Sequence, residues 1–267
     1  MLRRWRESWQ ARREAAAVQR RSIPDDLWKR TLVRYPFLQR TDAAAAAELR
    51  RLTSLFLDSK EFSAAGGLHL TDAMTVAIAA QAVLPVLRLG LGRYAGFVGI
   101  VVHANQVRAR REVLDDDGIV HEYNEDLAGE AVDGGPVMLS WHDVRAAGMS
   151  AGSAYNVVIH EFAHVLDMAN GRADGMPLLP AEIAPAKWRA TLSAHFEGLV
   201  HSAAANQATL LDPYGAQGED EFFAVATEAF FVRAVAMKKE HPDLYGMFSV
   251  FYRQDPAAEQ PAPRRRN

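Results

Sequence analysis

The chain contains 267 residues, of which 49% are hydrophobic and 24% charged, so it is long enough to bury a sizeable core. Its formal net charge of −3 gives no general attraction to nucleic acid or to an anionic membrane, and we expect no direct nucleic-acid binding. Cysteine is absent, which excludes a disulfide framework and any thiolate metal site.

Targeting signals are also absent from the sequence. No apolar run reaches the roughly 18 residues that a membrane span needs. The N-terminus is basic but lacks the apolar stretch of a secretory signal. We therefore predict a cytoplasmic protein without a transmembrane segment.

Residues 1–21 contain seven arginines, with Trp5 and Trp9 one helical turn apart. This composition predicts an exposed helix or a frayed terminus, and a helix that binds a membrane surface or a partner is the alternative. Residues 25–60 have helical periodicity, for which Thr41-Asp42 offers an N-cap. After a Gly-Gly break, a second helix begins at Thr71 or Asp72, and its body, TVAIAAQAVLPVL, is apolar enough to be buried.

Three segments rich in β-branched residues, at 96–107, 119–124 and 136–141, are predicted to be strands. Two long helices follow, at about 153–169 and 218–239, joined by a proline-rich connection that is a candidate lid. Helices, then a small mixed sheet, then helices again indicate an α+β architecture.

Three parts of the chain are expected from this pattern: a basic segment at 1–21, one α+β domain over 22–254 whose first part is helical, and a tail. The tail, residues 255–267, is rich in proline and arginine and has no large apolar residue. We predict that it is disordered.

Chemistry is indicated most strongly by the sequence His160-Glu161-Phe162-Ala163-His164. Residues four apart lie on one face of a helix, so both imidazoles can bind one zinc ion at about 2 Å. Glu161 is rotated by about 100° from His160, where its carboxylate can reach a metal-bound water without displacing it. This pattern predicts a zinc site with Glu161 as the catalytic base.

The rest of that helix is consistent with this assignment. Its other side is apolar, Ser153 is expected to cap its start, and Gly171 is expected to end it. Asp167 shares the face of His160 and His164, and metal-bound histidines usually donate their second N–H to a carboxylate. Asp167 is therefore a candidate partner of a ligand histidine, with an ordinary helix-terminal polar residue as an equal alternative.

A third protein ligand is needed, and the sequence after the second histidine does not supply a third histidine. The downstream helix offers two carboxylates, Glu221 and Glu228, which are seven residues apart and lie on one face among phenylalanines. Carboxylates in such surroundings are costly to bury unless they are paired or bind a metal. The pattern of residues does not choose between the two.

The chain resembles the Mlc titration factor A family of bacterial zinc metallopeptidases. The resemblance covers roughly residues 22–250 and is carried by the following segments, in this order: SIPDDLWKRTLVRYPFL, FLDSKEF, GLHLTDAMTVAIAAQAVLPVLRLGL, GGPVMLSWHDV, HEFAHVLDMANG and LDPYGAQGEDEFFAVATEAFF. These proteins are glutamate-zincins, whose catalytic fold is similar to the protease domain of anthrax lethal factor. The resemblance implies a zincin-like fold, with a small mixed sheet, an HExxH helix and a downstream helix that carries the ligand glutamate.

The resemblance also implies roles for individual residues. His160 and His164 become zinc ligands, and Glu161 becomes the base. In the family a tyrosine precedes the ligand glutamate by seven residues; Tyr214 and Glu221 match it, so the resemblance favours Glu221 as third ligand and Tyr214 as the hydroxyl that stabilises the oxyanion. Glu228 is then expected to support the site from outside the ligand set.

Two further expectations come from the family: aminopeptidase-like cleavage of small peptides, and binding of the transcriptional repressor Mlc. An interaction protein that sequesters such a regulator, with peptidase activity secondary, is the alternative function. A zinc hydrolase of other amides or esters is a third. We also expect the strand at 136–141 to offer its edge to an extended peptide, which Val137→Pro would test.

Overall fold

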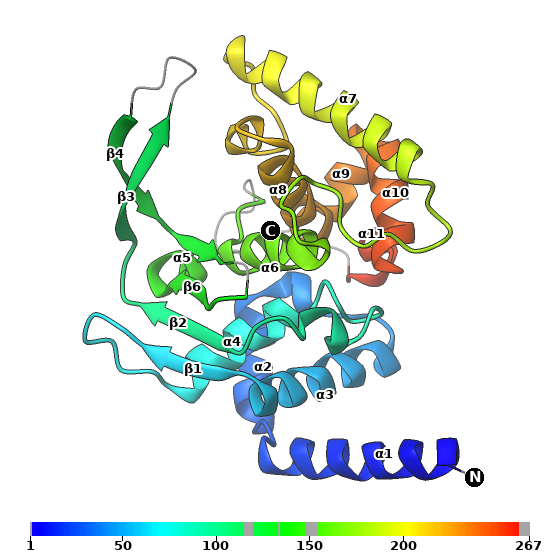
Figure 1. Cartoon of the computed structure of the whole chain (residues 1–267). Helices are drawn as coiled ribbons and strands as arrows, with labels where there is room; N and C mark the ends of the chain where they lie inside the picture. The colour runs from blue at the N-terminus through cyan, green and yellow to red at the C-terminus, as the bar shows by residue number, and fades with distance from the viewer. Residues whose placement is uncertain (1, 115–119, 133, 148–153, 262–267) are drawn as a thin grey trace, which may run out of the picture.

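A four-stranded mixed sheet has the order β1–β2–β6–β5 in the computed structural model, which describes residues 2–114, 120–132, 134–147 and 154–261 (Figure 1). The first three strands in this order run parallel, and β5 pairs with β6 antiparallel. The strands are β1 (Glu61–Ala64), β2 (Gly99–His103), β6 (Val137–Ser140) and β5 (Gly129–Ala131). The α+β class and the mixed sheet are confirmed.

The sheet corrects one expectation about substrate binding. The predicted strand at 136–141 is β6, and it is paired with β2 on one side and β5 on the other. It therefore has no free edge, and the hypothesis that it binds a peptide was wrong. The edge on this side of the sheet, within the described residues, is β5, a strand of three residues that is too short to show a period in the sequence.

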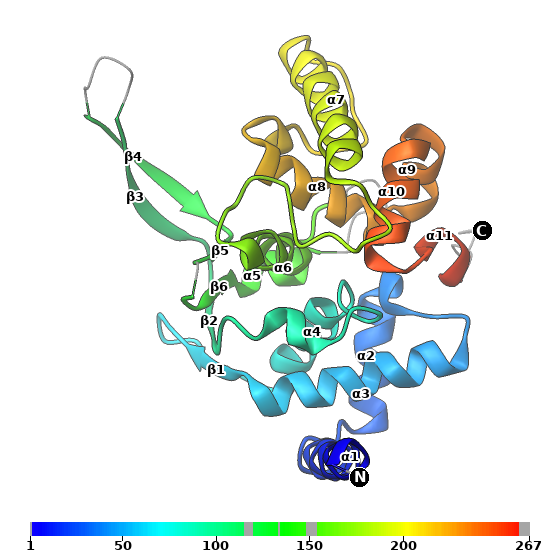
Figure 2. The ribbon, with the colours of Figure 1, turned by 45° about the vertical axis from the view of Figure 1, so that its right-hand side comes forward.

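Two longer strands, β3 (Val107–Leu114) and β4 (Val120–Leu127), form an antiparallel hairpin of their own. The hairpin projects away from the helices and leads directly into β5 (Figure 2). The sequence placed one strand at 96–107, where the structure has β2, a short break and the start of β3.

The helices before β2 form an N-terminal layer in the lower part of the molecule as drawn, with α1 below the others (Figure 1). It comprises α1 (Leu2–Arg20), α2 (Asp25–Arg34), η1 (Pro36–Leu38), α3 (Ala43–Ser59), α4 (Asp72–Val83) and η2 (Leu91–Tyr94). The helix expected over 25–60 is thus interrupted at Pro36, because proline disfavours helical backbone in the residue before it. Asp42 caps α3 and Thr71 caps α4, as the sequence indicated.

Helix α1 lies along α3 rather than fraying. The Arg20 guanidinium donates to both carboxylate oxygens of Asp58, at 3.2 and 2.8 Å, and Arg51 of α3 pairs with Glu14 at 2.8 Å. Trp5 and Trp9 are exposed, so this helix is attached through polar contacts and a small apolar strip.

The C-terminal part is helical. It contains α5 (Trp141–Ala146), α6 (Val157–Asp167), η3 (Met168–Asn170), α7 (Pro185–Ala204), η4 (Pro213–Ala216), α8 (Glu219–Val232), α9 (Ala234–Glu240), α10 (Pro242–Tyr252) and α11 (Pro256–Glu259). Helix α7 was not predicted from the sequence, because prolines dominate that connection. Its Pro185 occupies the first turn of the helix, however, where a missing N–H is tolerated.

The chain after Asp255 differs from the disordered tail that the sequence predicted. Helix α11 forms there, and the side-chain amide of Gln260 donates to the carbonyls of Phe37 at 3.1 Å and Phe231 at 2.6 Å. A short run of polar and alanine residues is held in place by backbone acceptors elsewhere in the fold, which composition cannot indicate. Residues 262–267 of the predicted tail lie outside the described residues.

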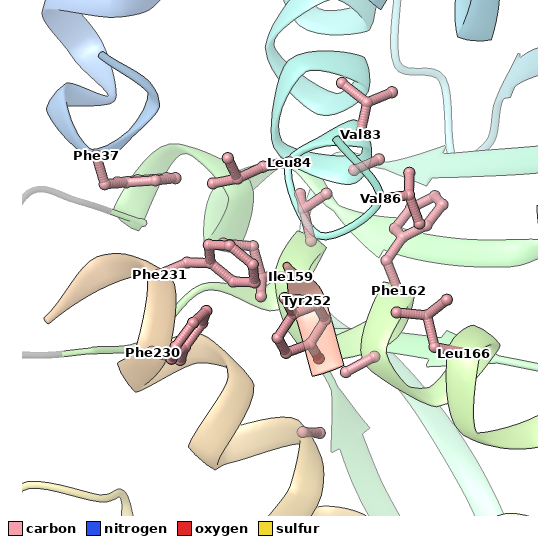
Figure 3. Packing of buried hydrophobic residues seen from close by; sticks show 14 of the residues in the cluster. Phe37, Val83, Leu84, Val86, Ile159, Phe162, Leu166, Phe230, Phe231 and Tyr252 are labelled. Carbon is pink, nitrogen blue, oxygen red and sulfur yellow. The ribbon is translucent and has the colours of Figure 1, made fainter. Parts of the chain in front are cut away.

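One apolar core joins the N-terminal helices to the C-terminal ones (Figure 3). Side chains from η1, the end of α4, α6, α8 and α10 meet there, namely Phe37, Val83, Leu84, Val86, Ile159, Phe162, Leu166, Phe230, Phe231 and Tyr252. Helix α6 therefore lies in the middle of the molecule with one side in this core. Among the described helices, none is both long and apolar enough to cross a bilayer.

Candidate active site

Helix α6 presents the HExxH residues to helix α8. The helix begins at Val157, and its cap is Asn156, whose Oδ1 accepts from the backbone N–H of Ile159 at 3.0 Å. The expected cap, Ser153, lies outside the described residues. Gly171 ends the following turn with a left-handed φ of 89°, as predicted.

Three side chains bring their ligand atoms together between α6 and α8. His160 Nε2 is 3.0 Å from Glu221 Oε2 and 3.2 Å from His164 Nε2, and His164 Nε2 is 3.5 Å from Glu221 Oε2. Ligands at about 2.0–2.1 Å from a tetrahedral zinc ion lie roughly 3.3–3.4 Å apart. The distances between these three atoms are therefore close to those expected around a zinc ion. His160, His164 and Glu221 form the group of possible metal ligands among the described residues.

Glu228 lies on the opposite side of the His160 ring. Its Oε1 is 2.8 Å from His160 Nδ1, while Oε2 accepts from the backbone N–H of Asn156. The Glu228 side chain is only 4% exposed. The two carboxylates that the sequence could not distinguish thus contact different nitrogens of one imidazole: Glu221 faces Nε2 at the ligand group, and Glu228 faces Nδ1 behind it.

The acidities of these carboxyl groups differ with their surroundings. Burial by itself would raise the pKa of Glu221, but hydrogen bonds with His160 and His164 outweigh it and hold that pKa at about 2. Burial raises the pKa of Glu161, against the opposing effect of the charge on the two histidines. Glu161 is therefore the more basic of these two carboxylates, and Glu221 is the more acidic.

Glu161 is packed against the edge strand. It is 5% exposed, and a Cβ atom built on Gly129 of β5 would lie 2.5 Å from Glu161 Oε1. Only glycine leaves room for the carboxylate at this point. This role of Gly129 could not be predicted from the sequence, because the contact joins residues that are distant in the chain and belong to different elements.

Asp167 has a different partner from the one expected. It is fully buried, and its Oδ2 accepts from the backbone N–H of Gly175 at 2.8 Å. Its Oδ1 has no hydrogen-bond partner among the described residues, and burial raises the pKa of Asp167 to about 7. Asp167 therefore ties the loop after α6 to the helix, while the histidine contact expected of it is made by Glu228 with His160.

A cavity of about 280 Å³ opens beside the ligand group. It is lined by Ala128, Gly129, Tyr155, Val157, His160, Glu161, Asp212, Tyr214, Val225 and Glu228. Tyr214 is 38% exposed, and its ring centroid is 5.9 Å from that of His160. Most of the residues that line this cavity are acidic or small and apolar, and the described lining contains neither lysine nor arginine.

The family model for glucose-regulated metallo-peptidase M90 matches residues 6–253 of this chain. The chain belongs to the M90 metallopeptidase family. It is therefore a peptide hydrolase, and the group formed by His160, His164 and Glu221 is the candidate metal site of an M90 peptidase. This assignment confirms the family resemblance that the sequence motifs carried.

Curated relatives agree with the family assignment. The M90 peptidase is similar to Mlc titration factor A of Pectobacterium atrosepticum, with 36% identity over 79% of this chain and 80% of the relative. Proteins of the same name in Klebsiella pneumoniae and Edwardsiella ictaluri are 33% and 39% identical, over 87% and 71% of this chain and 88% and 72% of the relatives.

Proposed function

We propose that this M90 peptidase is a zinc-dependent, aminopeptidase-like enzyme whose metal is held by His160, His164 and Glu221. The observation that carries the proposal is the convergence of three ligand atoms, from two helices, at separations of 3.0–3.5 Å. With no thiolate available and two imidazoles in the set, the donors suit zinc better than magnesium or calcium, which prefer oxygen ligands.

When bound, zinc would lower the pKa of a water molecule and polarise the substrate carbonyl. Glu161 accepts a proton from the attacking water and passes it to the leaving amine, a role for which burial has raised its pKa. The Tyr214 hydroxyl donates a hydrogen bond to the oxyanion of the tetrahedral intermediate. Glu228 accepts the Nδ1 proton of His160, which directs the unprotonated Nε2 towards the ligand group.

Strand β5 and the cavity support a peptide substrate. The Ser140 N–H donates to the Ala128 carbonyl at 2.7 Å, and because hydrogen-bonded pairs alternate along antiparallel strands, Gly129 and Ala131 direct their N–H groups to the open edge. An extended peptide can pair there, beside Glu161. Asp212 in the cavity lining favours a substrate whose free α-ammonium group enters the cavity, which is the basis for proposing aminopeptidase-like cleavage.

The decisive experiment combines zinc analysis with a panel of aminoacyl and internally quenched peptides, run on wild type and Glu161→Gln. We expect one zinc per chain in both proteins, turnover of aminoacyl substrates by wild type, and a loss of at least ~100-fold in kcat for the variant. A Glu161→Gln protein that binds zinc and hydrolyses peptides normally would refute the mechanism.

Tyr214 is tested separately. Tyr214→Phe removes the hydroxyl and keeps the ring beside His160, so we expect kcat to fall by roughly 10²-fold while zinc affinity is unchanged. A rise in KM with kcat unchanged would instead make Tyr214 a substrate-binding residue.

The relatives named Mlc titration factor A support a second function, binding of a transcriptional regulator of the Mlc kind. A pull-down with the Glu161→Gln protein distinguishes this function from catalysis, because regulator binding should survive the loss of the base. Capture that disappears with the substitution would argue against a separate binding role. The cytoplasmic location stays a prediction.

A further inference from the structure

A glutamine is buried in α4, a helix made mostly of apolar residues. Gln81 of α4 is fully inaccessible, as are its apolar neighbours Ala80 and Ala82. An amide in such a place is costly unless both of its polar atoms are hydrogen-bonded. The Gln81 Nε2 donates to the Ala77 carbonyl at 3.0 Å, one turn earlier, and Oε1 accepts from Asn156 Nδ2 at 2.8 Å.

Asn156 links that glutamine to the metal site. Its side chain is fully buried and uses both ends: Nδ2 donates to Gln81, and Oδ1 caps α6 through Ile159 N–H. Its own backbone N–H donates to Glu228 Oε2, and Glu228 Oε1 contacts His160 Nδ1 at 2.8 Å. Three hydrogen bonds thus connect Gln81 of α4 with His160, a candidate zinc ligand, and the residues between them are buried.

Gln81 and Ile159 together determine which end of the Asn156 amide donates and which end accepts. If the Asn156 amide were reversed, its NH₂ group would face the N–H of Ile159 and its oxygen would face an acceptor. The Oε1 of Gln81 and the N–H of Ile159 therefore favour the same orientation, the one in which Asn156 caps α6. These two side-chain hydrogen bonds anchor Asn156 between α4 and α6, its backbone N–H donates to Glu228, and Glu228 in turn contacts the His160 ring.

We propose that Gln81 and Asn156 are positioning residues of the metal centre, acting on His160 through Glu228. The proposal rests on the zinc site proposed above. It assigns a role at the site to α4, a helix of the N-terminal layer whose residues do not line the cavity. Coupling of this kind is expected because outer partners of a ligand histidine fix its tautomer and ring orientation.

Three variants test the proposal that Gln81 and Asn156 position the metal centre. Gln81→Met keeps the length of the side chain but removes the acceptor, and Asn156→Ser keeps a good helix cap but removes the donor to Gln81. The double variant breaks the same hydrogen bond. Ile78→Val is the matched control, because Ile78 is also fully buried on α4 and has no part in the chain of hydrogen bonds.

Zinc affinity, measured by chelator competition, and the visible spectrum of the cobalt-substituted protein are the readouts. We expect each single variant to weaken zinc binding roughly three- to tenfold, less than the ~10–100-fold typical of a direct outer partner. The double variant should be no weaker than the worse single variant, since both disrupt one interaction. The cobalt bands should shift in all three, whereas Ile78→Val should lower Tm by about 2–4 °C and leave both readouts unchanged.

Each other outcome has a definite meaning. Wild-type zinc affinity and cobalt spectra in Gln81→Met and Asn156→Ser would overturn the inference and make the hydrogen bond a purely structural tie. Equal changes in Ile78→Val would overturn it too, because they would trace the effect to packing. A wild-type protein that binds no zinc would instead refute the proposed function itself.

Discussion

The fit between Gly129 and Glu161 sets the position of the proposed base. A Cβ on Gly129 would lie 2.5 Å from Glu161 Oε1 and 2.7 Å from its Cγ, so Gly129→Ala forces the carboxylate to move. We expect kcat to fall by about 100-fold, as a misplacement near 1 Å can produce, with zinc affinity unchanged. Steady-state kinetics on an aminoacyl substrate measures the effect.

Gly99→Ala is the matched control. Gly99 is also a strand glycine, and its added Cβ would meet only Pro136, at ordinary distances of 3.5 Å from Cβ and 3.9 Å from Cα. Its activity should be close to that of wild type. Equal losses in the two variants would show that strand glycines matter for stability rather than for the placement of Glu161.

Asp167 makes the stability of the protein depend on pH. Burial raises its pKa from 3.8 to about 7, so the folded protein keeps a proton that the unfolded chain has lost between pH ~4 and 7. Stability therefore falls as pH rises through this window. Asp167→Asn retains an acceptor for Gly175 without the charge, and we expect its Tm to exceed that of wild type by about 5 °C at pH 8 and by little at pH 4.

Thermal unfolding from pH 4 to pH 8 checks this difference. Asp72→Asn is the control, because Asp72 is an exposed aspartate at the start of α4, away from the loop that Asp167 contacts. A Tm difference between Asp167→Asn and wild type that does not grow with pH would contradict the assignment.

At the scale of elements, the short strand β5 is the candidate peptide-binding edge. Ala131→Pro removes an N–H that points away from β6, and proline is tolerated on an edge strand, so the sheet should remain intact. We expect KM for extended peptides to rise roughly tenfold, the effect of one lost main-chain hydrogen bond, with zinc affinity unchanged. Ala131→Val, which keeps the N–H, should retain the wild-type KM.

Val137→Pro, which the sequence suggested, does not isolate substrate binding. Val137 is 1% exposed and lies in an inner strand, so proline there breaks the ladder of the sheet and lowers stability. If Ala131→Pro leaves KM unchanged, the peptide does not pair with this edge.

At the scale of the whole molecule, the metal site and the core share the same two helices. Zinc bound between α6 and α8 links elements that also carry Phe162 and Phe230 into the core, so metal binding should stabilise the entire fold. At free zinc of 100 times Kd we expect a gain of ~2.7 kcal/mol, or roughly 5–10 °C in Tm, which chelation abolishes.

Two variants distinguish the proposed metal ligand, Glu221, from the proposed base, Glu161, when the zinc-induced change in Tm is measured. Glu221→Gln should lose most of the zinc-induced shift, whereas Glu161→Gln should retain it, because Glu161 is not a proposed ligand. Loss of the shift in Glu161→Gln alone would reverse these roles. A single cooperative transition is also expected, since the core runs from η1 to α10.

The sequence by itself determined the parts of the site that depend on one helix. His160, Glu161 and His164 need only the helical period to share a face, and the caps Asp42 and Thr71 need only local backbone geometry. The motifs of the family then favoured Glu221, and the structure brings that carboxylate to both histidines. Local chemistry and spacing are properties of the chain itself.

Only the tertiary structure decided what lies between segments that are distant in the chain. In the folded protein Glu228 contacts the Nδ1 of His160, Asp167 accepts from the N–H of Gly175, and Gly129 lies against Glu161. Among the described strands, β5 rather than β6 forms the open edge of the sheet. Each of these contacts depends on how two elements pack, and neither element carries a period or motif that specifies its partner. Hydrogen bonds formed across an interface between elements are fixed by packing, and packing is a property of the whole chain.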